Sequence, residues 1–261
     1  MRRRLCTLPH LLCLALSLAG VAQTPPPTAA SAACPQFSVE QVVEKLGRRN
    51  SERAQALRAY HSTRTYRVEY RGFPGGRRAE MVVDMTFGPP ATKTFVIRSQ
   101  TGSKLLIDRV LKKLLESEKE AFTAEAQKRT ALTPDNYSFA LEGCESIGEG
   151  SHYVLAVEPK IKNKFLYRGK IWVDAGDFAV ARIAAEPAKN PSFWIKQTQI
   201  EQVYGKVDEF WMPMRNRSVT SVRLGGRADL TIDYQDYKMA VVPAAMNGTK
   251  QSRAEIIAQP R

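Results

Sequence analysis

One stretch constrains the fold of this chain more than any other: residues 160–174 read KIKNKFLYRGKIWVD and alternate between two kinds of side chain. A strand places successive side chains on opposite faces, so the alternation predicts one long, half-buried strand. Its solvent face carries the basic residues Lys160, Lys162, Lys164, Arg168 and Lys170. On its apolar face Gly169 leaves room for a close neighbour, a bulge or a ligand. An edge strand of an ordinary β-sandwich and a strand in the wall of a cavity both fit this pattern.

The first residues predict export. Three arginines precede a short apolar run from Leu8 to Leu18, and small residues follow, so residues 1–22 are expected to be a secretory signal peptide. Removing them takes away three arginines and no acids, which lowers the formal net charge from +13 to +10. The mature protein is expected in the periplasm, where anionic lipid headgroups are the polyanion that a basic protein meets. The positive charge also fits a role in solubility alone.

Residues 23–37 are rich in Pro, Ala, Ser and Thr, a composition typical of a disordered linker. Cys34 lies in this linker and raises the alternative of a lipoprotein anchored by acylation. Ser31, Ala32 and Ala33 suit that processing poorly, so soluble export is favoured. Cys34 and Cys144 are the two cysteines that remain after signal cleavage. In an oxidising compartment they can pair, and the sequence leaves a disulfide and two free thiols both open.

Two segments have helical periodicity. Ser38 and Gln41 form a capping-box pair ahead of an apolar stripe, which predicts a helix that runs to about Ala59. A second stripe begins after Ser103 and predicts a helix that continues towards Lys128. This second helix interrupts a chain that otherwise reads as strands.

The remaining order is β-structure. Alternating segments separated by Gly, Pro and Asp turns predict about ten antiparallel strands within one domain, residues 38–240. Residues 241–261 do not show this alternation and are expected to be a loose tail. The predicted fold class is α+β, mainly antiparallel β: an unclosed, curved barrel with an N-terminal helix and an inserted helix that acts as plug or lid.

The sequence lacks the usual anchors of catalysis. It contains no G-x-S-x-G elbow, phosphate-binding loop, H-E-x-x-H motif or dinucleotide fingerprint, and its few His and Cys residues do not have metal-ligand spacing. We therefore expect no enzyme activity, no catalytic residues, no cofactor and no metal site. A hydrolase is the least favoured class, because no nucleophile and base form a visible pair.

The predicted sheet has one apolar face that must be covered. Its candidate lipid-binding residues are Tyr66, Val68, Tyr70, Met81, Val83, Met85, Phe95, Tyr167 and Ile171. If the two helices pack tightly on this face it is a core, and if they pack loosely it is a pocket for an apolar ligand. The sequence leaves both readings open.

A separate segment, residues 186–195, reads EPAKNPSFWI. Two prolines flank Asn190, and the bulky side chains of Phe193 and Trp194 follow, so a rigid loop presents aromatic groups beside the start of a strand. It is expected to be a lid over the cavity, a tip that docks on a membrane, or a loop packed on the barrel end.

Residues 53–70, which run into the first strand, and above all FLYRGKIWVDAGDFAVAR at positions 165–182 resemble the LolA and LolB superfamily of periplasmic lipoprotein carriers. The second segment is also similar to the lipid-sensing N-terminal domain of a regulator of the envelope-stress sigma factor. The resemblance covers roughly residues 38–240 and implies an unclosed antiparallel barrel with helices as plug or lid.

These observations lead to a functional prediction. The protein is expected to bind lipid or lipoprotein in the periplasm, and to carry or sort outer-membrane lipoproteins through an apolar cavity. The alternative is an envelope-stress sensor or scaffolding domain of the same fold that binds lipoprotein or a protein partner. Expected partners are an acylated lipoprotein or lipid, an anionic membrane surface and an inner-membrane donor complex, and no nucleic acid is expected.

Overall fold

The computed structural model describes residues 34–88, 92–148, 150–190, 192–223 and 225–240. The predicted signal peptide, the linker up to residue 33 and the predicted tail at 241–261 lie outside these ranges. None of the helices in the described ranges combines the length and apolar character that a membrane crossing requires.

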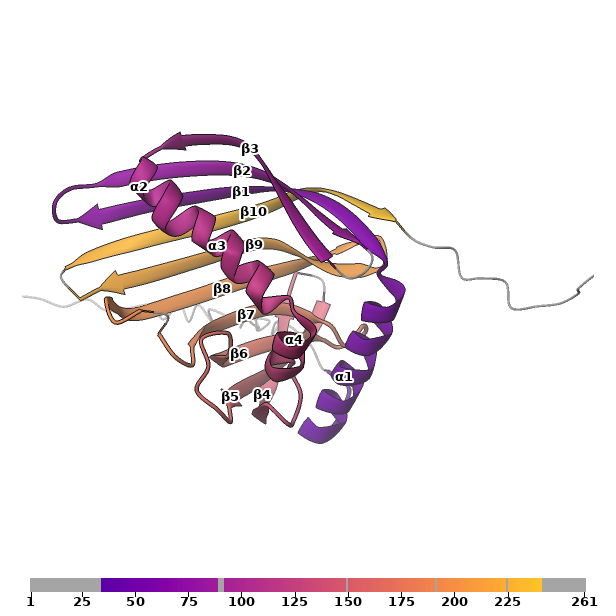
Figure 1. Ribbon diagram of the computed structural model, residues 1–261. Helices are drawn as coiled ribbons and strands as arrows, with labels where there is room; N and C mark the ends of the chain where they lie inside the picture. The colour runs from indigo at the N-terminus through magenta and orange to yellow at the C-terminus, as the bar shows by residue number, and fades with distance from the viewer. Residues whose placement is uncertain (1–33, 89–91, 149, 191, 224, 241–261) are drawn as a thin grey trace, which may run out of the picture. The chain divides into compact units, whose positions relative to one another are not determined.

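Ten strands form one antiparallel sheet in the order β3-β2-β1-β10-β9-β8-β7-β6-β5-β4 (Figure 1). Their bounds are β1 Ala59–Gly72, β2 Arg77–Gly88, β3 Thr92–Gly102, β4 Tyr137–Ile147, β5 Gly150–Pro159, β6 Tyr167–Asp174, β7 Val180–Pro187, β8 Ile195–Val207, β9 Phe210–Val222 and β10 Gly226–Ala240. The first and last strands in this order, β3 and β4, are not paired with each other, so the sheet is not closed into a barrel. The predicted fold class is confirmed.

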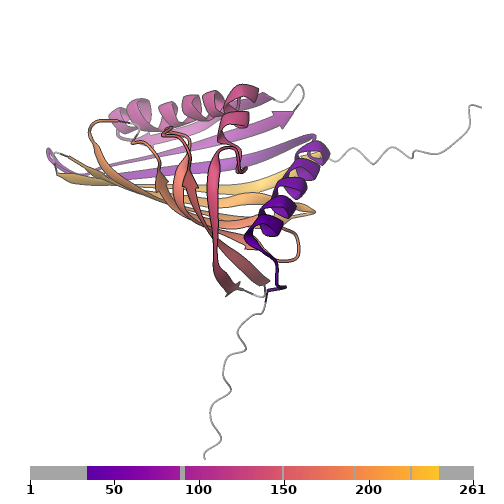
Figure 2. The same cartoon turned by 90° about the horizontal axis from the view of Figure 1, so that it is seen from below.

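The helical segments are α1 Val39–Ala56, α2 Lys104–Leu106, the π-helical turn η1 Ile107–Leu111, α3 Lys112–Ala121 and α4 Ala124–Thr130. The capping box of Ser38 and Gln41 starts α1, because the Ser38 hydroxyl accepts from the Gln41 amide and the Gln41 side chain accepts from the Ser38 amide. We call α2, η1, α3 and α4 the inserted helices, because they join β3 to β4. In Figure 1 they run diagonally across the sheet from α2, beside β2, to α4, and in Figure 2 they form a row separate from α1.

The structure corrects the predicted strand at residues 160–174. Only its second half is a strand, β6, and residues 160–166 form the turn between β5 and β6. The Asn163 side chain accepts from the Phe165 amide and its carbonyl accepts from the Leu166 amide. Asn favours such turns, and these bonds end the alternating pattern that the sequence suggests.

The predicted linker also differs at its end, because residues 34–37 lie against the sheet. Cys34 is bonded to Cys144 of β4, and the carbonyl of Pro35 accepts a hydrogen bond of 2.7 Å from the Tyr153 hydroxyl. Phe37 packs against the ring of Tyr153 at 6.4 Å between centroids. Residues 34–37 therefore belong to the folded domain.

Candidate functional site

The strand register brings the predicted lipid-binding residues to the same face of the sheet. Tyr66 of β1 lies opposite Met81 of β2 on one side and opposite Ile232 of β10 on the other. From Ile232 the directly opposed residues lead across β9, β8 and β7 to Ile171 of β6, with Gln202 as the residue on β8. Side chains directly opposite each other in a ladder share a face. All helical segments cover this face, which we call the inner face (Figure 1).

The inner face holds two packed clusters rather than one continuous cavity. The inserted helices cover the first cluster, which contains Tyr66, Val68, Met81, Val83, Leu106, Ile107, Leu111 and Leu115, with Tyr70 and Phe95 packed against it. The second lies under α1 and contains Ile171, with Tyr167 packed against it. Met85 is also fully buried. The predicted residues are thus together on one face, but helices cover them and their side chains fill the space.

The inserted helices contact the sheet through a narrow apolar stripe. Leu106, Ile107, Leu111 and Leu115 are buried, whereas Leu105 is 54% exposed. A π-helical turn lies in the middle of this stripe. Such turns are rare and often occur at functional sites, because they interrupt the regular helical hydrogen bonds.

A buried ion pair attaches the end of α3 to the inner face. Arg64, which is 3% exposed, donates from Nη1 to a Glu118 carboxylate oxygen at 2.7 Å. The other Glu118 oxygen accepts from the Lys93 ammonium at 2.8 Å. Burial opposes ionisation of Glu118, but Arg64 and Lys93 outweigh it and hold the pKa of its carboxyl below the usual value.

Several polar atoms on the inner face have no hydrogen-bond partner within the described residues. They are Ser62 Oγ and Arg64 Nε on β1 and Gln202 Nε2 on β8. A buried polar atom without a partner costs about 1–3 kcal/mol. A bound molecule with oxygen atoms, such as the ester or amide carbonyl of an acyl chain, would satisfy them.

A small cavity of about 240 Å³ lies between α1 and the inner face. Its lining includes Asn50 and Arg53 of α1 together with Tyr167, Ile183 and Tyr204 of the sheet. Burial raises the pKa of the Tyr204 hydroxyl to about 12. Ligand pockets usually measure at least about 300 Å³, so this cavity holds at most part of an acyl chain in this structure.

A hollow of about 910 Å³ lies on the opposite face of the sheet. Ala156, Lys170, Ala184 and Glu201 of its lining are register partners, and they alternate with the residues that face the helices. Three ion pairs line this groove: Lys170–Glu142, Arg168–Glu186 and Arg182–Glu201. Because four acidic and four basic side chains line this groove, it is a poor site for an acyl chain.

The predicted basic rim does not form one continuous basic surface. Arg168 and Lys170 are paired with carboxylates in that groove, and the Lys164 ammonium contacts Glu120 at 2.8 Å. Lys160 and Lys162 are exposed in the turn and form no ion pair within the described ranges. The sequence pattern missed these carboxylates because they lie on other strands and on α3.

The predicted lid loop is exposed. Asn190 closes the loop by donating from Nδ2 to the carbonyls of Ile195 and Lys196, both at 3.2 Å. Phe193 is 75% exposed and Trp194 is 55% exposed, and their rings pack edge to face at 5.7 Å. The aromatic rings therefore do not pack on the end of the sheet.

Cys34 and Cys144 form a disulfide with a Cα separation of 5.8 Å, one of the two states that the sequence left open for these residues. It attaches the segment that precedes α1 to the edge strand β4. A sulfur in a disulfide has no thiol for acylation, so this structure does not fit a lipid anchor at Cys34.

Two charged residues of the site were missed by sequence reasoning. Arg64 lies on the same face of β1 as Tyr66 and Val68. An arginine at a position of the apolar face was the sequence signal that could have identified it. Glu118 follows Leu111 and Leu115 at helical spacing, which places a carboxylate on the stripe that faces the sheet.

No protein-family model matches this sequence, and no curated protein matches it significantly. Solved structures do resemble it. A DUF1329 family protein from Desulfovibrio piger has a TM-score of 0.39 and 11% identity, with 81% of this chain and 96% of that chain covered. The LolA superfamily protein NE2245 from Nitrosomonas europaea has a TM-score of 0.34 and 12% identity, with 82% and 99% covered.

The MucA/MucB complex of Pseudomonas aeruginosa also matches, at a TM-score of 0.27 and 11% identity, with 77% of this chain and 100% of that chain covered. All three TM-scores are below 0.5, so the function proposed below rests on this chain's own residues. The resemblance to LolA superfamily proteins that residues 165–182 predict is found among these structures, and it concerns the fold alone.

Proposed function

We propose that this protein binds the acyl chains of a lipid or lipoprotein on its inner face and carries them through the periplasm without catalysing a reaction. The inserted helices cover the site, and ligand entry requires that they move away from β1 and β2. Acyl chains then replace the leucine stripe, and each buried methylene group contributes about 0.8 kcal/mol.

The observation that carries this proposal is the presence of polar atoms without partners on the inner face. Ser62 and Arg64 follow one another on the same face of β1, and Ser62 Oγ and Arg64 Nε are buried and lack a partner in the described part. Buried polar atoms are usually hydrogen-bonded, and a ligand with carbonyl oxygens next to its acyl chains would supply acceptors for them.

The packed inner face also favours a second candidate. If the inserted helices never leave, the face is a core, and the protein is a sensor or scaffolding domain that binds a protein partner elsewhere on its surface. The tight burial of Met81, Val83 and Leu111, each 0% exposed, is what this reading explains best.

Thermal unfolding with and without lipid separates the two candidates. Delipidated protein is mixed with a diacylated lipopeptide or with a long-chain fatty acid. A ligand at about 100 times its dissociation constant stabilises the folded protein by about 2.7 kcal/mol, which raises the melting temperature. Absence of a shift with both ligands, and of lipid in organic extracts of natively purified protein, contradicts the carrier and leaves the scaffolding reading.

A further inference from the structure

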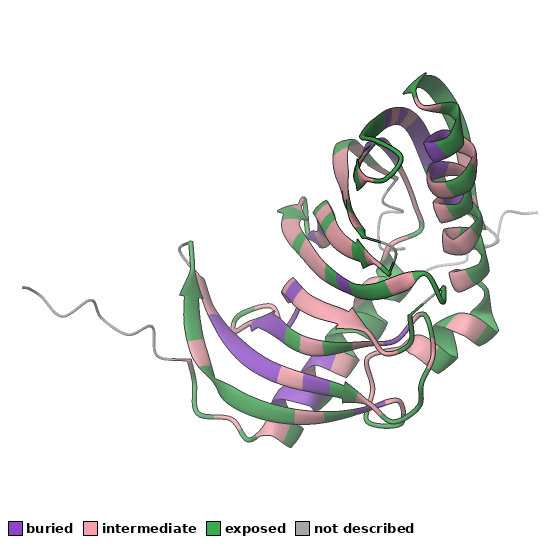
Figure 3. Ribbon diagram, turned by 90° about the vertical axis from the view of Figure 1, so that its left-hand side faces the viewer, coloured by how far each residue is buried: buried purple, intermediate pink, exposed green. Residues whose placement is uncertain are grey.

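The turns at one end of the sheet form a continuous edge. In an antiparallel sheet alternate turns lie at the same end, so the turns after β1, β5, β7 and β9 and the start of α2 share an end, on the left in Figure 1 and facing the viewer in Figure 3. Backbone hydrogen bonds connect them: Arg223 donates to Trp194 at 2.9 Å and Ala188 donates to Leu166 at 2.8 Å. We call this end the turn edge.

The turn edge concentrates the exposed hydrophobic side chains. Six large hydrophobic residues in the described ranges are more than half exposed, and all except Val96 lie at the turn edge. The five are Phe73 (87%), Phe193 (75%), Trp194 (55%), Leu105 (54%) and Ile161 (53%). Such residues scattered singly need no explanation, but five of six at one end of a sheet indicate an interaction surface.

The aromatic residues at this edge are held in place. Arg223 donates from Nε to the Phe193 carbonyl at 2.6 Å, and its guanidinium lies 5.0 Å from the centre of the Phe193 ring. The hydroxyl of Tyr70 donates to the Phe73 carbonyl at 3.0 Å. The rings are therefore presented outward by a fixed backbone.

Basic side chains surround these hydrophobic residues. The following exposed cations lie at the turn edge and form no ion pair within the described ranges: Arg77, Lys104, Lys160, Lys162, Lys189 and Lys196. Their charges are therefore available to a partner outside the chain.

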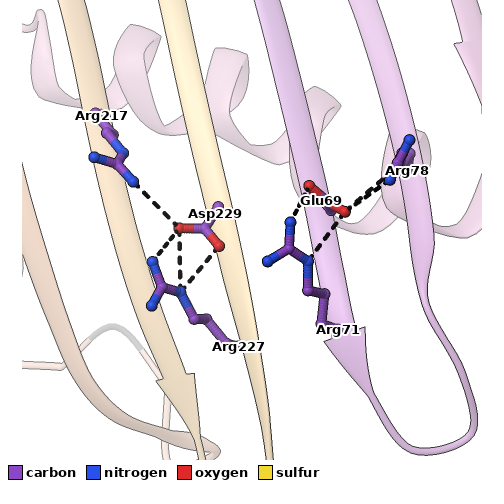
Figure 4. A network of polar contacts seen from close by, with 6 residues as sticks. All are labelled: Glu69, Arg71, Arg78, Arg217, Arg227 and Asp229. Atoms are coloured by element: carbon purple, nitrogen blue, oxygen red, sulfur yellow. Dashed lines mark hydrogen bonds and ion pairs between the residues drawn. The ribbon is translucent and has the colours of Figure 1, made fainter.

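Ion pairs next to the edge also leave excess positive charge. Each of two carboxylates is shared by two arginines, so each group of three residues has a net charge of +1 (Figure 4). Glu69 contacts Arg71 at 2.9 Å and Arg78 at 3.1 Å, and Asp229 contacts Arg227 at 2.8 Å and Arg217 at 3.9 Å.

The opposite end of the sheet carries charges of both signs. Its turns carry Asp174 and Asp177 after β6, and Asp208 and Glu209 after β8. Lys206 pairs with Asp177 at 2.8 Å, and Arg58 and Lys238 are exposed at the same end, so cations partly offset these carboxylates. The unpaired cations of the turn edge are therefore what an anionic surface would attract.

We propose that the turn edge docks the protein onto an anionic lipid bilayer. Phe73, Phe193 and Trp194 insert at the level of the headgroups, where aromatic rings are favoured, and the unpaired lysines contact lipid phosphates. This surface is separate from the inner face, and docking through it does not require a lipid or lipoprotein bound on the inner face.

The spacing of the turns favours a bilayer over a protein partner. Strands lie about 4.8 Å apart, so the edge from β2 to β5 extends over roughly 30 Å. The hydrophobic side chains sit on separate turns along this length instead of forming one contiguous patch, which suits individual insertion into a lipid surface.

Co-sedimentation with vesicles tests the proposal. The full mature chain is mixed with vesicles of phosphatidylethanolamine and phosphatidylglycerol, or of phosphatidylcholine alone. We expect binding to the anionic vesicles at low salt and its loss at high salt, because salt screens exposed charges. No binding to the anionic vesicles at low salt overturns the proposal.

Matched variants locate the surface. Phe73→Ser with Phe193→Ser and Trp194→Ser, and separately Lys162→Glu with Lys189→Glu, should each weaken binding at least about ten-fold. The controls are Val96→Ser with Val203→Ser, and Arg58→Glu with Lys238→Glu, which make similar changes at exposed positions away from the turn edge. Equal losses in the controls and the edge variants contradict the proposal.

Tryptophan quenching reports the orientation. Trp172 is 7% exposed, and Trp211 is half-buried at the start of β9, at the end of the sheet opposite the turn edge. Phosphatidylglycerol brominated on its acyl chains should therefore quench mainly Trp194, which is 55% exposed. The Trp194→Phe variant should lose most of this quenching and still sediment with vesicles. Unchanged quenching in that variant would overturn the assigned orientation. Because the vesicles contain no cargo, these outcomes do not depend on the proposed carrier function.

Discussion

The Arg64 guanidinium of β1 donates to the Glu118 carboxylate of α3 across 2.7 Å, and this contact joins the inner face to the inserted helices. The two residues are 54 positions apart in the sequence, and the Arg64 side chain is 4% exposed. An arginine buried this deeply needs a carboxylate partner, so the position of α3 determines whether its charge is compensated.

We predict that Glu118→Gln destabilises the closed structure. It leaves the buried Arg64 charge without its partner at a cost of about 2 kcal/mol. This value is below the usual cost of breaking a buried ion pair because Glu118 is partly exposed. Hydrogen exchange of residues 112–121 should accelerate by more than ten-fold. Lys93→Met, which keeps the Arg64–Glu118 contact, should have a smaller effect, and equal effects would contradict this role of Arg64.

Acid should open the same contact. The pKa of the Glu118 carboxyl is lower in the folded protein than in the unfolded chain, so its contribution is fully present above about pH 4.5 and is lost as the pH falls through the folded-state value. Hydrogen exchange of α3 should therefore accelerate below about pH 4.5. The Glu118→Gln variant should lack this pH dependence, and a wild-type-like acid response in it would argue for other carboxylates.

The Leu111→Ala variant should show whether the inserted helices open to admit a ligand, as a lid, or stay packed on the sheet, as a plug. Leu111 is 0% exposed under the inserted helices, so its truncation should cost the closed state about 2–4 kcal/mol. If the helices are a lid, this variant should bind a diacylated lipopeptide more tightly than wild type, because less free energy is spent on opening. Lys113→Ala, an exposed position on the same helix, should change neither stability nor affinity. Destabilisation without a change in lipid affinity would indicate a plug.

Gly169→Ala should destabilise β6. Gly169 has a φ of +146°, and an added Cβ would lie 2.4 Å from the Ala184 carbonyl oxygen and 2.7 Å from the Ala185 Cα. A cost of about 2–4 kcal/mol is expected in chemical denaturation, because the clash is with backbone atoms. Gly47→Ala, in the middle of α1 with no atom within 4 Å of the new Cβ, should instead stabilise by up to about 1 kcal/mol.

The Cys34–Cys144 bond closes a sequence separation of 110 residues. In the chain-entropy model such a loop contributes at most about 5 kcal/mol, so Cys34→Ser with Cys144→Ser should lower the free energy of unfolding by about 2–5 kcal/mol. The measurement is denaturant unfolding of oxidised wild type and the double variant. Two free thiols in the purified wild-type protein would contradict the bond itself.

Local sequence signals were sufficient for most elements. The capping box of Ser38 and Gln41 marked the start of α1, and alternation marked the ten strands, because both signals depend on residues close together in the chain. The alternation misled only at 160–166, where Ile161 and Asn163 follow the strand pattern but belong to a turn.

Other features depended on long-range pairing. The residues predicted to line one cavity belong to two clusters, since β1 and β6 are separated by β10, β9, β8 and β7 in the sheet. The cations of the predicted basic rim are partly neutralised by Glu120, Glu142 and Glu186 from other elements.

Local patterns were enough to predict the antiparallel fold, the N-terminal helix and the inserted helices, because periodicity and capping act within a few residues. The contact of Arg64 with Glu118, and the shared edge of Phe73, Phe193 and Trp194, are visible only in the folded molecule. Those relationships follow from the pairing of β1 with β10 and of β9 with β8, which brings turns more than 100 residues apart to the same end of the sheet. Pairing over such distances is set by the whole arrangement of side chains on both faces, and no local pattern encodes it.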